Sequence, residues 1–174
     1  VYAIAAAALS AAVLVAFAGI WPYNGAAFDD WAYIFYGDIR SITVLGSNRQ
    51  FGLFQMVASE ILFPGRIQIF HYLHVINVIL AGLLLFHLMR RFLPQQRWFA
   101  LFYALLYVLY IPNNLDHARA LYAGNIYSWV TLLGLSAFVL LVEFTHQKGW
   151  QRWLMMLMAA GLAYAASRAF ETMI

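Results

Sequence analysis

The sequence contains no cysteine, which excludes a disulfide, a thiol nucleophile and a cysteine-based metal site. Charge is also scarce. Asp, Glu, Lys and Arg make up 10% of the 174 residues, whereas an ordinary soluble domain carries about 25%. Lys148 is the only lysine, and no run of basic residues points to nucleic-acid binding. The partners to consider are therefore membrane lipid and small molecules rather than nucleic acid.

Apolar side chains are in surplus. Hydrophobic residues make up 65% of the chain, aromatic residues 18%, and the mean hydropathy is +0.76. A globule of this length has too little interior to bury so many apolar side chains, so lipid must solvate many of them. The composition predicts an integral membrane protein, with its many Trp and Tyr rings at the membrane interfaces.

Five apolar stretches predict an all-α polytopic transmembrane helix bundle, because about 20 helical residues cross a hydrocarbon core of about 30 Å. A further stretch, 51–63, is apolar at a helical period and predicts a short interfacial helix within an outer loop. The five predicted spans are 1–20, 67–89, 98–112, 126–142 and 153–167.

Alternation of the spans divides the loops between two sides. The short loops 90–97 and 143–152 share one side and hold five basic residues and one acid, Glu143. Short basic loops are typically cytoplasmic. The segments 26–66, 113–125 and 168–171 then lie on the non-cytoplasmic side with the other six acids. We expect these acids and their neighbouring arginines to form one polar site.

Two adjacent aspartates, Asp29 and Asp30, follow the first predicted span. A carboxylate beside apolar walls can serve as a general base, and arginines such as Arg49 and Arg168 suit phosphate because the planar guanidinium gives two parallel hydrogen bonds. The structural alternative for the aspartate pair is a solvated turn or a helix cap. Arg168 and Glu171 could likewise form only a local salt bridge.

His71 and His74 are three residues apart on one helical face. Two helical histidines without a nearby carboxylate are a weak signal for zinc, and a haem would need a facing histidine from another span. We therefore expect a hydrogen-bonded interior polar face there, and no metal site is predicted.

The order of these features resembles the start of a GT-C class membrane glycosyltransferase, of the mannosyltransferase or arabinosyltransferase kind. The resemblance lies in an apolar span followed by FDDWAY, the turn GSNRQ at 46–50, an interfacial helix and then FHYLHVINVILAGLLLFHLMRRF. Relatives often have Gly-Arg-Pro where this chain has Asn-Arg-Gln. Known members are longer, so we expect residues 1–174 to be a single transmembrane domain from the N-terminal part of such a module.

The resemblance implies an inverting transfer of sugar from a polyprenyl-phosphate donor at the outer face of a bacterial inner membrane. Asp29 would activate the acceptor, and Asp30 would support it. Arg49 and Arg168 would bind the donor phosphate, with His117 and Glu171 as further candidates. Some members need a divalent cation such as Mg²⁺ or Mn²⁺ and others do not, which leaves the cofactor open. The alternatives are a transporter or flippase-like protein for a lipid or small solute, and a non-catalytic scaffold.

Overall fold

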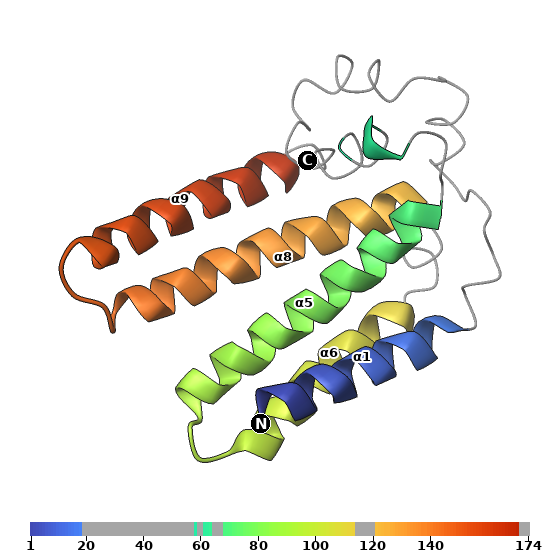
Figure 1. The fold of residues 1–174 in the computed structure, drawn as a ribbon, viewed down its shortest axis with the longest axis horizontal. Helices are drawn as coiled ribbons and strands as arrows, with labels where there is room; N and C mark the ends of the chain where they lie inside the picture. Colours follow the sequence, from blue (N-terminus) through green and yellow to red (C-terminus); the bar gives the residue numbers. More distant parts are fainter. Residues whose placement is uncertain (19–57, 59–60, 64–67, 114–120, 171–174) are drawn as a thin grey trace.

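A computed structural model describes residues 1–18, 58, 61–63, 68–113 and 121–170, and this part of the chain is helical without strands. It contains five helices of substantial length, one for each apolar stretch that the sequence marks out (Figure 1). Most of the predicted interfacial helix, 51–63, falls outside the described residues. The five helices are α1 (Tyr2–Ala18), α5 (Gln68–Phe92), α6 (Arg97–Asn113), α8 (Leu121–Phe144) and α9 (Trp150–Phe170).

Two tight turns connect these helices. Between α5 and α6, the Leu93 N–H donates to the Met89 carbonyl at 2.8 Å and the Gln96 N–H donates to the Leu93 carbonyl at 3.0 Å. Pro94 fits this turn because it has no N–H to give to a continuing helix. Between α8 and α9, Gly149 has a φ of 66°, a left-handed conformation that costs glycine little. Both turns are short, so each pair of helices runs antiparallel.

The helices form a row rather than a closed ring (Figure 1). Helix α9 packs on α8, α8 packs on α5, and α5 packs on both α1 and α6, which also touch each other. Successive helices alternate in direction, so α5 and α8 run parallel although they are neighbours. We call the end with the α5–α6 and α8–α9 turns the basic end, because it holds Arg90, Arg91, Arg97, Lys148 and Arg152.

The best-packed region lies where α1, α5 and α6 meet. Helix α1 buries every fourth residue along one ridge, and small residues on α6 let the backbones approach closely. Gly82 marks the tightest point, since a Cβ there would lie 2.7 Å from Cγ1 of Val108. The buried members of this core are Ala5, Leu9, Val13, Phe17, Val75, Val78, Phe86, Ala100, Ala104 and Val108.

Large apolar side chains are exposed on every helix. On α9, Ala159 and Ala169 are the only buried residues among those whose side chains are described. Two stretches of the described residues, Ile69–Phe92 and Tyr127–Phe144, are long and apolar enough to cross a membrane. The predicted all-helical bundle is confirmed. Of the five membrane spans that the sequence predicts, two meet this criterion of length and apolar composition within the described residues. Tyr2–Ala18 and Arg97–Tyr110 are apolar but shorter, and α9 carries Gln151, Arg152 and Arg168 near its ends.

Candidate functional site

Most of the predicted site residues lie outside the described part of the chain. These are Asp29, Asp30, Arg49, His117 and Glu171. Arg168 is described: it lies in the last turn of α9 and is partly exposed. The single acidic site that the sequence predicts therefore stays a prediction.

The helix ends that border these segments are nevertheless placed. The chain leaves α1 at Ala18, α6 at Asn113 and α9 at Phe170, and it enters α5 at Gln68 and α8 at Leu121. All five ends lie at the same end of the bundle, opposite the basic end (Figure 1). The stretches 19–67, 114–120 and 171–174 are thus joined to one end of the bundle, and six of the seven acids belong to them.

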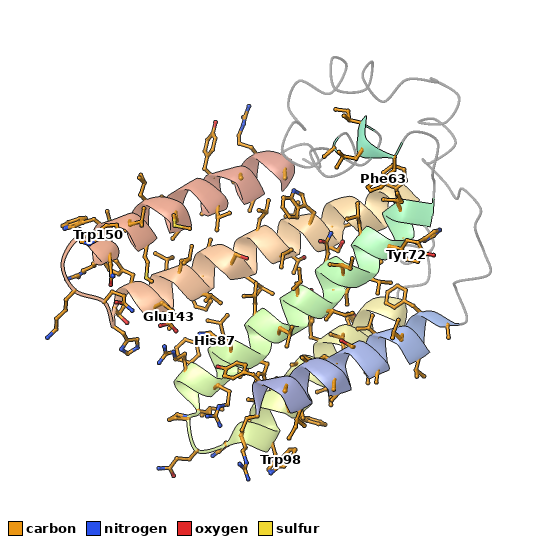
Figure 2. The ribbon with its side chains drawn as sticks, viewed as in Figure 1. Phe63, Tyr72, His87, Trp98, Glu143 and Trp150 are labelled. Carbon is orange, nitrogen blue, oxygen red and sulfur yellow. The ribbon has the colours of Figure 1, made fainter. Side chains whose placement is uncertain are left out.

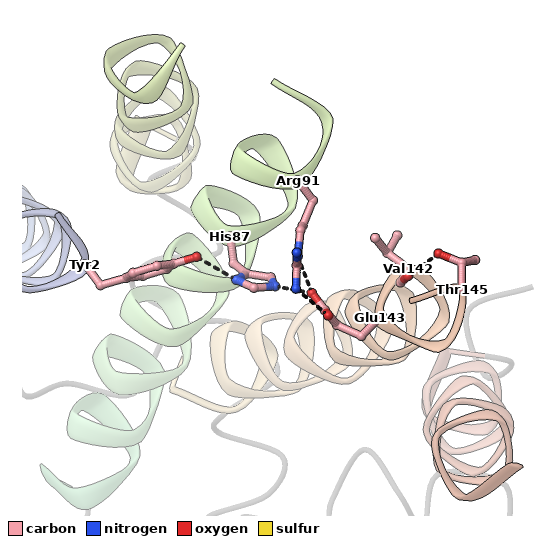
Figure 3. Close-up of polar contacts among 6 residues, drawn as sticks. All are labelled: Tyr2, His87, Arg91, Val142, Glu143 and Thr145. Carbon is pink, nitrogen blue, oxygen red and sulfur yellow. Dashed lines mark hydrogen bonds and ion pairs between the residues drawn. The ribbon is translucent and has the colours of Figure 1, made fainter. Parts of the chain in front are cut away.

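At the basic end, a charged cluster that the sequence analysis does not anticipate joins three helices (Figure 3). Arg91 on α5 donates from Nε and Nη2 to the two carboxylate oxygens of Glu143 on α8, at 2.5 and 2.6 Å. His87, one turn before Arg91, places Nε2 at 2.8 Å from Oε1 of Glu143. The Tyr2 hydroxyl on α1 lies 2.9 Å from Nδ1 of His87. We call Tyr2, His87, Arg91 and Glu143 the Glu143 clamp.

The clamp satisfies its own charge and hydrogen bonds. His87 presents Nε2 to Glu143 and Nδ1 to the Tyr2 hydroxyl, so one imidazole links both partners. The arginine charge balances the carboxylate through a two-pronged contact, the strongest common geometry for such a pair. The Glu143 side chain is only 15% exposed, compared with 43% for Arg91. The Glu143 carboxylate therefore links α5 to α8, and it has little room left to bind a ligand.

A second polar cluster lies deeper, between α5 and α8 and beside α1. His74 Nδ1 lies 3.1 Å from the Ser128 hydroxyl, and Asn77 Nδ2 donates to the same hydroxyl at 3.3 Å. All three side chains are at least 93% buried. The ring of Phe17 on α1 meets the His74 ring edge-on, with centroids 5.3 Å apart. We call His74, Asn77 and Ser128 the Ser128 trio.

The trio confirms the interior polar face expected for this part of α5. His74 and Asn77, three residues apart, point to the same neighbouring helix and share one hydroxyl. No group of three His, Cys, Asp or Glu side chains gathers within the described residues in a way that could hold a metal ion. The described chemistry of the trio is hydrogen bonding among three side chains, none of which is an Asp, Glu, Lys or Arg.

The Glu143 clamp could have been found from the sequence by two signals. His87 and Arg91 are four residues apart, so they share a helical face. Glu143 is the single acid in the two basic loops, so it is the natural partner for a basic residue there. What the sequence could not supply is that α5 and α8 are neighbours. Compared with known proteins, the chain matches no family model, no curated protein and no solved structure.

Proposed function

We propose that the chain forms part of an integral-membrane glycosyltransferase of the GT-C class, which moves a sugar from a polyprenyl-phosphate donor to an acceptor at the non-cytoplasmic face. One observation carries the proposal beyond the sequence resemblance. The helix ends that border the three acid-bearing stretches share one end of the bundle, and the basic turns share the other. Residues drawn from three separated segments can then serve one site at one membrane face.

The proposal places all five helices across the membrane. Helices α1 and α6 have 17 residues each, and a membrane span needs about 20. Helix α9 has 21 residues and is apolar between its polar ends. Its exposed apolar side chains, such as Trp153, Leu157 and Tyr164, need lipid or further protein to cover them.

Under this proposal, Asp29 is the general base. It takes the proton from the acceptor hydroxyl while the acceptor oxygen forms its bond to the anomeric carbon, and the bond between sugar and phosphate breaks with inversion. Arg49 and Arg168 stabilise the departing polyprenyl phosphate through charge-assisted hydrogen bonds. Asp30 holds the acceptor or a divalent cation, and His117 and Glu171 contact the substrate.

The transporter alternative fits the described charges less well. Transporters hold ionisable residues and broken helices near the membrane midplane. In the part of the chain that the structure describes, the charged side chains of the helices lie in their first or last turns: Arg90, Arg91, Arg97, Glu143, Arg152 and Arg168. The deeper Ser128 trio contains no Asp, Glu, Lys or Arg. This distribution favours chemistry at a membrane surface over passage of a charged solute through the bundle.

The test uses the full-length protein in membranes and a radiolabelled polyprenyl-phosphate sugar. We expect Asp29→Asn to retain the folded protein and donor binding but to lose transfer by about 10²-fold or more, as for a lost general base. Arg152→Gln, at the basic end, is the control and should transfer sugar normally. Wild-type protein without transfer activity, or Asp29→Asn with unchanged activity, would remove the assignment. Donor movement across vesicles without transfer would favour the transporter.

A further inference from the structure

Two hollows flank the first turns of α1, one on each side. The first, of about 130 Å³, lies between α1, α5 and α6. The second, of about 540 Å³, lies between α1, α5 and α8. Both have mainly apolar walls and both lie towards the basic end, so they differ chiefly in the polar groups at their rims. The walls of the first hollow include Val1, Ile4, Phe86, Arg97, Trp98 and Leu101, and those of the second include Tyr2 and His87.

The polar groups at the rim of the second hollow already have hydrogen-bond partners. Its polar wall residues, Tyr2 and His87, bond to each other and onward to Glu143. Arg91 balances the charge of that carboxylate. An anion entering here would have to compete with Glu143 for Arg91, and a cation would have to compete with Arg91 for Glu143. This hollow therefore has no charge preference to offer a ligand.

At the rim of the first hollow, the charge of Arg97 is balanced by no acid of the described part of the chain. Arg97 lines the hollow, and among the described residues the only acid in an ion pair is Glu143, which is taken by His87 and Arg91. The guanidinium of Arg97 lies 5.6 Å from the centre of the Trp98 ring, which leaves its N–H groups for a ligand. Trp98 itself is 64% exposed and lies at the same end as His87 and Glu143 (Figure 2).

We propose that the first hollow binds a membrane phospholipid with an anionic headgroup. The phosphate lies against Arg97, whose planar guanidinium matches it with two parallel hydrogen bonds. The first carbons of one acyl chain lie against Ile4, Phe86 and Leu101, where the cavity volume resembles that of an engineered cavity of about 150 Å³ that holds a benzene ring. Trp98 covers the junction between headgroup and chain, the usual level of tryptophan in membranes.

The charge of the basic end selects this class of lipid. Five basic residues and one acid lie in and beside its two turns, and basic residues at this level attract anionic lipids. The site is also separate from the proposed transfer chemistry, because the acid-bearing stretches are joined to the opposite end of the bundle. The inference needs only that the bundle lies in a membrane, so it can fail or hold independently of the glycosyltransferase proposal.

The test measures lipid binding to the purified full-length protein by native mass spectrometry. The probes are phosphatidylglycerol and phosphatidylcholine of equal chain length. We expect wild type to bind phosphatidylglycerol more tightly, and Arg97→Gln to weaken that binding about fivefold to tenfold while leaving phosphatidylcholine binding unchanged. Ile4→Trp, which fills the hollow from an exposed position, should weaken binding of both lipids.

Arg152→Gln is the matched control, since Arg152 is an exposed arginine at the same end that stacks on Phe144 and lines neither hollow. It should bind phosphatidylglycerol as wild type does. An equal loss for Arg152→Gln and Arg97→Gln would overturn the site and leave only diffuse surface attraction. Unchanged binding in Arg97→Gln would overturn it directly. If Arg97→Gln misfolds, Arg97→Lys keeps the charge without the planar fork, and a loss of preference smaller than twofold relative to wild type would also contradict the proposed geometry.

Discussion

Helix α5 meets its neighbours in two different ways. Towards α1 and α6 it packs mainly through hydrocarbon, with Gly82 close to Val108 and Leu9. At the basic end of this side, the hydrogen bond between Tyr2 and His87 adds to the packing. Towards α8 it packs through hydrogen bonds, from His74 and Asn77 to Ser128 at one level and from His87 and Arg91 to Glu143 at another. The first side holds α5 by close approach, and the second fixes its register against α8.

The two polar levels also differ from each other in charge. They are thirteen residues apart on α5, which is about 20 Å along a helix. At the basic end, water and lipid headgroups can solvate Arg91, so an ion pair is tolerated there. The cluster at the deeper level contains no Asp, Glu, Lys or Arg, and an uncompensated charge in hydrocarbon costs several kcal/mol. The neighbouring helix is α8 at both levels, so the position along α5 decides whether an ion pair or hydrogen bonds without Asp, Glu, Lys or Arg join the two helices.

The largest expected effect comes from putting a charge at the deeper level. Asn77 is 1% exposed, and Asn77→Asp replaces its amide donor by a carboxyl group. We expect the free energy of unfolding to fall by about 3 kcal/mol at pH 7, because a carboxylate is far more costly to bury than the amide that it replaces. Reversible unfolding in mixed detergent micelles measures this loss.

Asn77→Ala is the control for that substitution. It also removes the hydrogen bond to Ser128 but adds no charge, so about 1 kcal/mol should be lost. Lowering the pH to about 4 should bring the two variants closer together, because a protonated carboxyl carries no charge. Equal losses for both variants at pH 7 would mean that this level is hydrated, and the difference in charge between the two levels would then have another cause.

A smaller effect is expected from crowding the apolar side. In Gly82→Ala the new Cβ would lie 2.7 Å from Cγ1 of Val108, whose branched side chain has little freedom to move. We expect about 2 kcal/mol of destabilisation from the forced shift of α5 or α6. The measurement is again unfolding in detergent.

Gly134 and Gly161 are matched controls, since each is a helical glycine with no atom within 4 Å of an added Cβ. Alanine at either position should be neutral or stabilise the protein by up to about 1 kcal/mol through its better helix propensity. Similar losses at all three glycines would contradict the idea that the α1 and α6 side of α5 is held by close approach.

The positions of the helices in the chain could be predicted from the sequence. Which helices pack against each other could not. Each apolar run contains a helix, a structure that satisfies the backbone hydrogen bonds of a run within the run itself. His74 and Asn77 could be assigned to one interior face by their spacing. That Glu143 would meet Arg91, however, depends on α5 and α8 being parallel neighbours, a tertiary choice that local patterns do not encode. The predicted outer-face site stays untested, since only Arg168 of its residues is described.

The smallest expected effect concerns the ion pair of the Glu143 clamp, because Arg91 is 43% exposed and solvent screens part of its charge. In a double-mutant cycle of Arg91→Gln and Glu143→Gln, we expect a coupling energy of about 1 kcal/mol. Each single variant leaves one partner without its counter-charge, so the double variant should be more stable than the sum of the two single losses predicts. Arg152→Gln combined with Glu143→Gln is the control pair and should show additive losses, since Arg152 stacks on Phe144 instead. A coupling energy near zero for Arg91 and Glu143 would mean that this ion pair does not stabilise the contact between α5 and α8, and that His87 is the remaining polar link to Glu143 at this level.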